Sequence, residues 1–296
     1  MSAAWLEQHE RGSALALSAM VWIALTAGRS VSRLFLVPIC AYFMLFSRRA
    51  RASSLAYLTR ALGRRARLSD LFRHYHAFAS TLHDRIYLLA GRIGGFEIEQ
   101  HGLQELSAAL AENRGCILLG SHLGSFDLLR VLGTHERKLP INVVMYPDNG
   151  PITQAALGRI SPEFLERVIP LGRPGALLRV KECLERREIV GILGDRMLRP
   201  EKAVACQFLG ATAPFPQGPL KLACTLKVPV VLFFGLYRGG PRYSVHFERL
   251  TMEPDIDRRD RAGRLALLVA RYAERLEHYC RAAPYNWFNF YDFWRA

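Results

Sequence analysis

Apolar and polar positions along the chain predict strands that alternate with helices. Short uninterrupted apolar runs end in glycine or polar residues, and segments with apolar residues at helical spacing separate them. We expect strands at Cys116–Gly120, Ile141–Tyr146, Ile189–Leu193, Val228–Tyr237 and Tyr243–Leu250. We expect helices at Ser69–Arg92, Leu103–Asn113, Ser125–Leu132, Ala176–Arg187, Pro219–Leu226 and Arg261–Cys280. Because continuous apolar runs are typical of strands buried on both faces, the fold class is α/β, with a mainly parallel central sheet flanked by helices.

The N-terminal part has a different pattern. Two uncharged runs, Ser13–Gly28 and Leu34–Phe46, are followed or interrupted by arginines, and the stretch from Gly28 to Leu68 holds nine arginines and no acidic residue. We interpret residues 1–68 as a membrane-associating helical segment and residues 69–296 as a separate α/β domain. Each run is shorter than the roughly 20 residues that a spanning helix needs. One tilted anchor and two helices lying in the interface both remain open, as does a helical layer packed on the domain.

Composition narrows the class of protein. The chain has 296 residues, a net charge of +14 and 50% hydrophobic residues, which excludes a disordered chain and a disulfide-stapled miniprotein. The positive charge suits a polyanion, and the apolar runs beside the arginines favour a membrane surface over nucleic acid. By the positive-inside rule, the arginines after Phe46 would face the cytoplasm. We therefore expect the α/β domain to lie on the cytoplasmic side of the inner membrane. No P-loop or Rossmann fingerprint is present, and His74 and His76 point to different helix faces, so we expect no nucleotide cofactor and no metal.

Candidate chemistry lies in the loop that follows the expected strand Cys116–Gly120. There, His122 precedes Asp127 in an H-x4-D arrangement, with Gly124 to permit a sharp turn and Ser125 as a helix N-cap. A helix N-terminus keeps an imidazole neutral, and a carboxylate would hold the ring in one tautomer. His122 and Asp127 thus form a candidate dyad for deprotonating a hydroxyl. The alternative is a turn histidine beside an acid that merely begins a helix.

Two more expected strands end in polar residues. Asp195 and Arg196 follow Ile189–Leu193, and Asn149 lies in a turn-rich loop after Ile141–Tyr146. An adjacent acid and arginine can bind a polar head group or simply form an ion pair. In parallel sheets, ligands bind beyond the carboxyl ends of the strands, which makes these residues candidates for substrate contact.

These blocks together resemble a known family. His122-x4-Asp127, Gly194-Asp195-Arg196, Gly218-Pro219 and Val228–Val231, in this order, are similar to the lysophospholipid acyltransferase superfamily and more closely to its bacterial late lipid A acyltransferase branch. The similarity extends to Pro284–Trp287 and so covers nearly the whole chain. The superfamily usually has a glutamate followed by Gly-Thr-Arg where this chain has Asp195-Arg196, which leaves the acceptor open.

The resemblance implies transfer of a fatty acyl group from an acyl carrier protein or coenzyme A thioester to a hydroxyl of an anionic membrane lipid or glycolipid. Under this hypothesis His122 removes the acceptor proton and Asp127 orients His122. Donors near Ser125, or Arg196, stabilise the oxyanion. Asn149, Arg159 and Asp195 position the acceptor head group.

Two alternatives remain from the residues themselves. A serine-type lipid hydrolase or esterase is conceivable because Ser121 and Ser125 flank the histidine, although no G-x-S-x-G elbow is present. A non-catalytic basic protein that binds membranes is the other alternative, and its binding would weaken steeply with salt.

Overall fold

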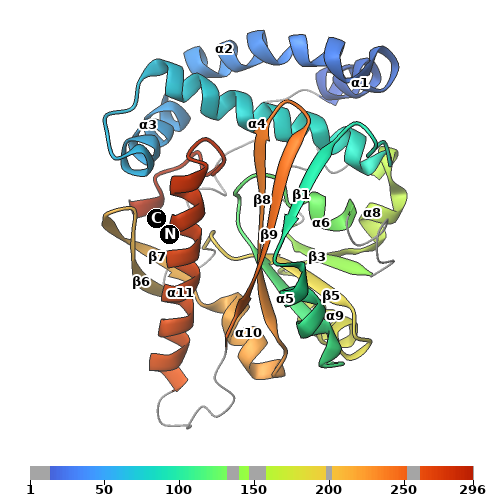
Figure 1. Ribbon diagram of the computed structural model, residues 1–296, viewed down its shortest axis with the longest axis vertical. Helices are drawn as coiled ribbons and strands as arrows, with labels where there is room; N and C mark the ends of the chain where they lie inside the picture. Colours follow the sequence, from blue (N-terminus) through green and yellow to red (C-terminus); the bar gives the residue numbers. More distant parts are fainter. Residues whose placement is uncertain (1–13, 132–139, 147–157, 198–201, 252–260, 296) are drawn as a thin grey trace.

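The computed structural model describes residues 14–131, 140–146, 158–197, 202–251 and 261–295. Within these segments, seven strands form a sheet in the order β1-β9-β8-β2-β5-β3-β4 (Figure 1). Its strands are β1 (Glu97–His101), β2 (Cys116–Gly120), β3 (Ile141–Met145), β4 (Val168–Pro170), β5 (Ile189–Leu193), β8 (Val230–Gly239) and β9 (Arg242–Leu250). Neighbouring strands are parallel except β8 and β9, which are antiparallel. The predicted α/β class with a mainly parallel sheet is confirmed.

Apolar side chains cover both faces of the sheet. Along β2, Ile117 and Leu119 belong to one buried cluster, and Cys116 and Leu118 belong to the other. The first face is covered by α9 (Ala176–Glu185), α10 (Gly218–Leu226), α11 (Arg261–Ala282) and the antiparallel hairpin β6 (Ala203–Phe208) and β7 (Ala211–Pro216). The second face is covered by α5 (Leu103–Ala111) and α6 (Leu128–Val131). Because successive side chains of a strand point to opposite faces, the uninterrupted apolar runs are explained by burial on both sides.

Four N-terminal helices form a layer across one end of the sheet (Figure 1). They are α1 (Ala14–Leu34), α2 (Leu36–Phe46), α3 (Arg48–Leu62) and α4 (Leu68–Leu89). Helix α4 lies between the sheet and the outer helices, and α2 packs along it. Taken singly, none of the described helices has the length and hydropathy of a membrane span, although Leu17–Leu34 and Leu36–Phe46 meet that criterion as a pair bent by 60°.

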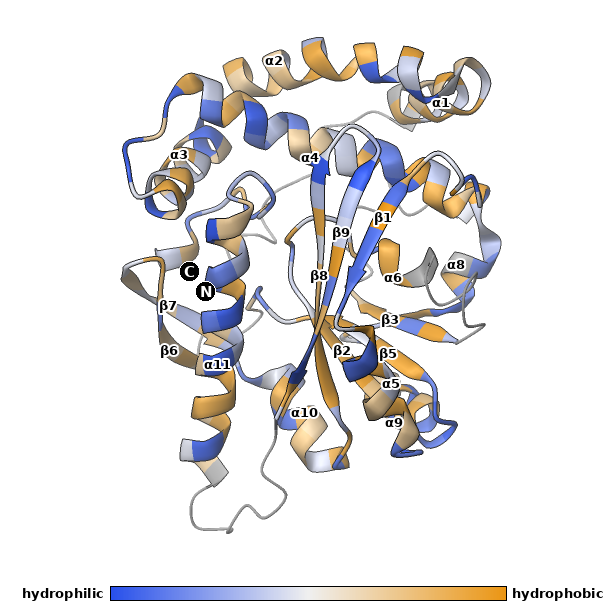
Figure 2. Cartoon of the chain, viewed as in Figure 1, coloured by the Kyte–Doolittle hydropathy of each residue, from blue (hydrophilic) through white to orange (hydrophobic). Residues whose placement is uncertain are grey.

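Helix α2 buries one side and exposes the other. Leu36 and Cys40 are buried, whereas large apolar side chains around and along the helix are exposed. Most of α2 is coloured hydrophobic in Figure 2. The exposed set is Leu34, Phe35, Val37, Ile39, Tyr42, Leu45 and Phe46. Exposed apolar patches of this kind mark surfaces that contact a membrane or another protein.

Some expected elements differ from those observed. The helix expected at 125–132 is observed as the short α6, which begins only at Leu128, and residue 132 lies outside the described residues. Strands β1, β4, β6 and β7, together with the short helices α8 (Pro162–Glu166) and η3 (Phe293–Arg295), were not expected. Strand β1 escapes the pattern because charged side chains occupy its exposed positions, as in Glu97 and Glu99.

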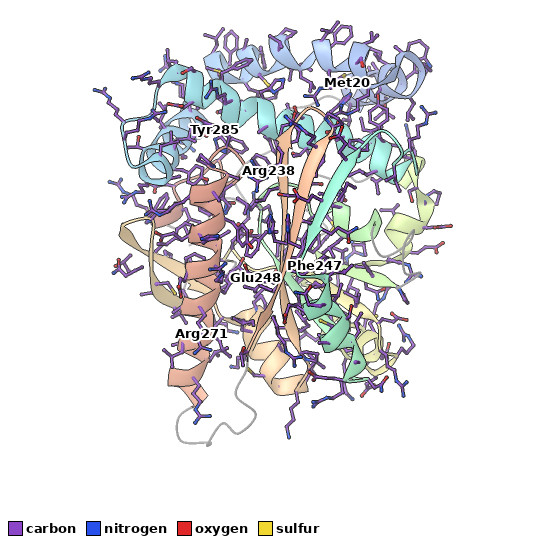
Figure 3. The ribbon with its side chains drawn as sticks, in the orientation of Figure 1. Met20, Arg238, Phe247, Glu248, Arg271 and Tyr285 are labelled. Atoms are coloured by element: carbon purple, nitrogen blue, oxygen red, sulfur yellow. The ribbon has the colours of Figure 1, made fainter. Side chains whose placement is uncertain are left out.

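The C-terminal helix α11 and the residues after it make polar contacts with the sheet and with the N-terminal layer. On β9, Glu248 accepts two hydrogen bonds from Arg275 (2.6 and 2.7 Å) and one from Tyr279 (2.6 Å) of α11. Beyond α11, Tyr285 lies near α3 and α4 and donates to Asp70 of α4 at 2.8 Å (Figure 3). Asp70 also accepts from Arg64 and caps α4 through the backbone N–H of Arg67.

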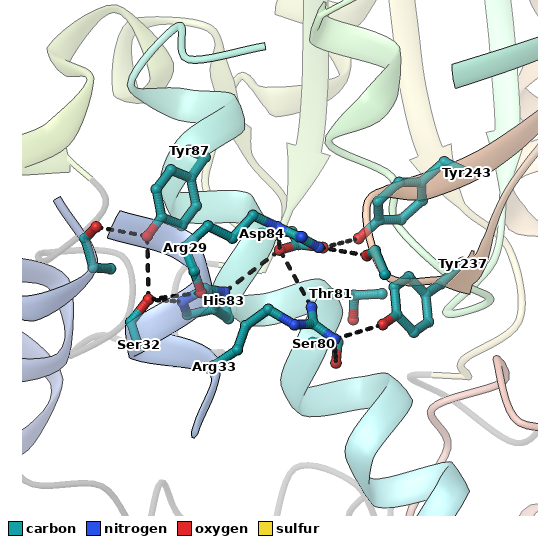
Figure 4. A network of polar contacts seen from close by, with 12 residues as sticks. Arg29, Ser32, Arg33, Ser80, Thr81, His83, Asp84, Tyr87, Tyr237 and Tyr243 are labelled. Atoms are coloured by element: carbon teal, nitrogen blue, oxygen red, sulfur yellow. Dashed lines mark hydrogen bonds and ion pairs between the residues drawn. The ribbon is translucent and has the colours of Figure 1, made fainter. Parts of the chain in front are cut away.

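A buried polar network joins α1, α4 and the β8–β9 hairpin (Figure 4). Asp84 of α4 has no exposed surface, and its carboxylate accepts two hydrogen bonds from Arg29 (2.8 and 2.9 Å) and one from Tyr243 (2.8 Å). Arg33 lies 3.8 Å from the same carboxylate and donates to the hydroxyl of Tyr237 at 2.8 Å. Two of the nine clustered arginines therefore hold the N-terminal layer on the domain instead of facing a polyanion.

We expect Asp84→Asn to lower the free energy of unfolding by about 3–5 kcal/mol, because the substitution leaves two largely buried guanidinium groups without their counter-ion. Thermal or urea unfolding measures the change. Asp292→Asn is the control, since Asp292 and its partner Arg295 are exposed and such pairs contribute little. Equal stability of the Asp84→Asn variant and the parent protein would show that the network does not hold the layer in place.

Candidate active site

Strands β2 and β5 are neighbours, and their register brings two candidate residues together. Gly120 of β2 is paired with Leu193 of β5, so that the residues two positions beyond each strand end, His122 and Asp195, lie side by side. Nδ1 of His122 donates to Oδ1 of Asp195 at 2.8 Å, and the backbone N–H of His122 donates to Oδ2 at 3.0 Å. His122 is therefore bound to this carboxylate through both its ring and its backbone N–H.

The two side chains differ in accessibility. The side chain of His122 is 24% exposed and that of Asp195 is 0% exposed. A substrate can therefore reach the imidazole but not the carboxylate. Since Nδ1 is occupied by Asp195, Nε2 is the nitrogen that remains for accepting a substrate proton.

The pKa values of the pair move in directions that suit a base and its counter-ion. Burial and the neighbouring Arg196 lower the pKa of His122 below 6.5, against an opposing contribution from Asp195. Burial opposes ionisation of Asp195, but the charge and hydrogen bonds of His122, together with Arg196, outweigh it and hold the pKa of Asp195 at about 2. At pH 7 the site thus holds an ionised carboxylate against a neutral imidazole whose proton is on Nδ1.

The structure differs from the expected pairing of His122 with Asp127. Oδ2 of Asp127 lies 2.9 Å from Nε of Arg85 on α4, and these two side chains are 17% and 16% exposed. Among the described residues, the ring of His122 is hydrogen-bonded to Asp195 and not to Asp127. Asp127 also precedes α6 and so does not occupy its first turn.

The path of the loop explains why Asp127 faces α4. Gly124 has a φ of +68°, and a side chain there would meet the carbonyl oxygen of Gly235 on β8 at 1.9 Å. The loop therefore lies directly on β8, where the N–H of Ser125 donates to that same carbonyl at 2.7 Å. Phe126 packs its ring over Gly120, where a Cβ would lie only 2.6 Å from the ring. Asp127 follows this anchor, and its carboxylate pairs with Arg85 of α4.

The remaining candidates divide into those near His122 and those apart from it. Arg196 lies beside the pair and influences the pKa of His122. The N–H of Ser125 is engaged by Gly235, so it is not a spare oxyanion donor. Arg159 is exposed, and among the described residues no hydrogen bond or ion pair joins it to the pair; Asn149 lies outside the described residues. Asp195, expected to contact an acceptor, has no exposed surface for doing so.

Two residues of the site were not expected from the sequence. Nε1 of Trp287 donates to Oδ2 of Asp195 at 3.0 Å, and Nδ2 of Asn289 donates to the same oxygen at 2.9 Å. Both lie in the C-terminal run Tyr285–Trp294, whose many aromatic residues indicate packing more than chemistry. The two asparagines of that run, which are buried, were the available signal, because a buried amide requires polar partners.

The serines that flank His122 do not offer an accessible nucleophile. Ser121 and Ser125 are each 4% exposed. A serine-type hydrolase needs its hydroxyl open to substrate, so the burial of both side chains argues against that alternative.

The chain is similar to one family of known proteins. The chain matches the family described as bacterial lipid A biosynthesis acyltransferase over residues 85–296, which includes β2, β5, His122, Asp195 and the C-terminal run. A search of curated proteins gave no match.

We expect Asp195→Asn to lower the pKa of His122 further, because the charge and hydrogen bond of Asp195 raise that pKa. Asp127→Asn is the matched variant and should shift the pKa less, since its carboxylate pairs with Arg85. NMR titration of ¹⁵N-histidine-labelled protein, with His122→Gln used to assign the signal, measures both shifts. A larger shift in the Asp127→Asn variant would show that Asp127 is the partner of His122 in solution.

Proposed function

Because the chain belongs to the bacterial lipid A biosynthesis acyltransferase family and is therefore an acyltransferase, we propose that His122 is the general base for transfer of a fatty acyl group to a lipid hydroxyl. The observation that carries this proposal is the accessible imidazole of His122 held by the inaccessible carboxylate of Asp195. The fixed proton on Nδ1 directs the lone pair of Nε2 toward the substrate side, as a general base requires.

The proposed reaction is a direct acyl transfer. Nε2 of His122 takes the proton of the acceptor hydroxyl while the oxygen attacks the carbonyl carbon of the acyl thioester. The carbon–sulfur bond then breaks, and the departing thiolate takes the proton back from the imidazolium. Asp195 stays ionised throughout and stabilises the imidazolium between the two proton transfers.

Arg196 is the proposed source of positive charge for the oxyanion that forms during attack. Its Nε donates to Oδ1 of Asn289 at 2.8 Å, and its Nη2 donates to the carbonyl of Phe288 at 3.2 Å. These bonds fix the guanidinium beside the imidazole before substrate binds. A prepositioned cation stabilises developing negative charge without reorganising during the reaction.

Asp127 has a supporting role under this proposal. Its ion pair with Arg85 ties the loop that carries His122 to α4. The carboxylate of the H-x4-D motif would then fix the position of the loop, whereas Asp195 fixes the ring.

The charge of the chain supports acidic substrates. With a net charge of +14, it would attract an acyl carrier protein, which is strongly acidic, and equally the phosphates of coenzyme A or of a glycolipid acceptor. We propose an acyl carrier protein or coenzyme A thioester as donor and a hydroxyl of an anionic lipid or glycolipid as acceptor.

Helices α1 and α2 are the proposed contact with the cytoplasmic face of the inner membrane. One side of α2 is packed on α4, and its other side exposes Leu45 and Phe46 at 68% and 63%, with one residue between Phe46 and the arginines Arg48 and Arg49. An apolar face bordered by arginines suits the interface of an anionic bilayer. Helices in this position would bring lipid acceptors to the domain that carries His122.

The activity test compares three variants of the purified protein in membranes or detergent, with acyl transfer followed by mass spectrometry. We expect His122→Ala to reduce turnover by about 10²- to 10⁴-fold, because the base is lost. Asp195→Asn should reduce turnover by a similar factor, because the amide favours the wrong tautomer of His122. Asp127→Asn should cost less. Near-parental turnover of the His122→Ala variant would refute the proposed mechanism.

The membrane test uses vesicle flotation. We expect Leu45→Ser combined with Phe46→Ser to weaken binding to phosphatidylglycerol vesicles by at least about tenfold, because each apolar side chain contributes about 1.5–3 kcal/mol when buried. Leu267→Ser is the control, since Leu267 is 64% exposed on α11 instead of α2. Unchanged binding of the double variant would place the membrane contact elsewhere.

A further inference from the structure

A four-residue segment after α11, Asn286–Asn289, lies along the loop that carries His122. The carbonyl of Asn286 accepts a hydrogen bond from the N–H of Gly124 at 2.8 Å, and the N–H of Phe288 donates to the carbonyl of His122 at 2.7 Å. Between these bonds, Trp287 forms an antiparallel bridge with Leu123. The backbone of the segment therefore fixes the backbone of the catalytic loop.

Two side chains of the same segment hold Asp195. Oδ2 of Asp195 accepts from Nε1 of Trp287 (3.0 Å), from Nδ2 of Asn289 (2.9 Å) and from the backbone N–H of His122 (3.0 Å). Oδ1 accepts from Nδ1 of His122 at 2.8 Å. Because three donors converge on Oδ2, the carboxylate cannot rotate without losing them, and Oδ1 stays directed at the imidazole.

The segment also holds the cation of the site. Asn289 donates to Asp195 through its amide nitrogen and accepts from Nε of Arg196 through its amide oxygen. The carbonyl of Phe288 accepts from the same guanidinium. One asparagine thus sets the relative positions of the negative and positive groups beside His122.

Neighbouring helices and strands also contact this segment. Nε2 of His74 on α4 donates to the carbonyl of Trp287 at 2.8 Å, and the Trp287 ring, which is 0% exposed, packs against the rings of Tyr57 and Phe208. On the other side, the amide of Asn286 pairs with both backbone groups of Tyr237 on β8. Contacts with α3, α4, β6 and β8 therefore fix the position of the segment.

We propose that Trp287 and Asn289 are positioning residues of the acyl-transfer site, which act through Asp195 to hold the imidazole of His122 in its reactive orientation. The inference rests on the proposed function of His122 as the base. Neither side chain touches the reacting atoms under this proposal. Their N–H groups disperse part of the negative charge of Asp195 and prevent the carboxylate from turning away.

The first experiment is Trp287→Phe, which removes the indole N–H and keeps an aromatic ring. Its matched control is Trp294→Phe, because Nε1 of Trp294 donates to the carbonyl of Phe208 at 3.3 Å and not to Asp195. We expect Trp287→Phe to lower kcat by about 10- to 100-fold, as for loss of a hydrogen bond to a charged group, while KM for donor and acceptor changes by less than about twofold. The control should retain the parental kcat.

The second experiment guards against a folding defect at the buried indole. Asn289→Leu removes both amide contacts at nearly constant volume, and Asn142→Leu is its control, since Asn142 is also buried and donates to Glu188 at 2.7 Å in another part of the sheet. We expect Asn289→Leu to lower kcat in the same way and Asn142→Leu to leave it unchanged. Thermal unfolding of all four variants separates lost stability from lost positioning.

The pH profile of kcat/KM distinguishes positioning from general support. Without one donor, Asp195 presents more negative charge to His122, so the acid limb of the profile should move to higher pH in the Trp287→Phe and Asn289→Leu variants. A purely structural role would lower activity and leave that limb in place, which would overturn the inference. Parental kcat in both variants would also overturn it.

His122→Ala separates this inference from the function beneath it. If His122→Ala is inactive and the two segment variants behave as the parent does, only the role of the segment is refuted. If His122→Ala retains turnover, the proposed base itself is refuted.

Discussion

The candidate site depends on one fully buried carboxylate, that of Asp195. Moving an ionised group out of water costs several kcal/mol, so Asp195 requires hydrogen-bond donors on every side that lacks water. Those donors come from distant parts of the chain: His122 after β2, and Trp287 and Asn289 after α11. Two segments far apart in sequence must therefore meet beside the end of β5 before the imidazole is held. The geometry of the site follows from satisfying this single charge.

Helix α4 connects that site to the outer helices of the N-terminal layer through adjacent residues. Asp84 faces α1 and the β8–β9 hairpin, where it binds Arg29 and Tyr243, while Arg85 lies 2.9 Å from Asp127 in the loop that carries His122. Adjacent residues of one turn of α4 thus contact the outer helices and the loop that carries His122. The N-terminal helices are part of the architecture of the site as well as the proposed contact with lipid.

The arginines clustered between Gly28 and Leu68 differ in their surroundings: some pair with carboxylates and others are exposed. Arg29 and Arg33 share the buried carboxylate of Asp84, and the half-exposed Arg64 pairs with the buried carboxylate of Asp70. Part of the positive charge of the cluster is therefore compensated within the protein. Arg48 and Arg49 remain exposed at the end of the apolar face of α2. The number of clustered arginines overstates how basic this part of the surface is, because a count does not reveal which arginines have internal partners. These exposed arginines lie beside the apolar surface that we propose contacts the membrane.

The sequence by itself determined the main strands and the location of the chemistry. Continuous apolar runs encode burial on both faces, so β2 and β5 were predicted at their observed bounds, and His122 and Asp195 were both placed at strand ends. Only the tertiary structure decided that Asp195, and not Asp127, holds His122. That pairing depends on the strand order, in which β2 lies beside β5, and on the path of the loop at Gly124 and Phe126. Strand order is set by packing among distant segments, and neither the spacing of His122 and Asp127 nor the aromatic run around Trp287 contains it.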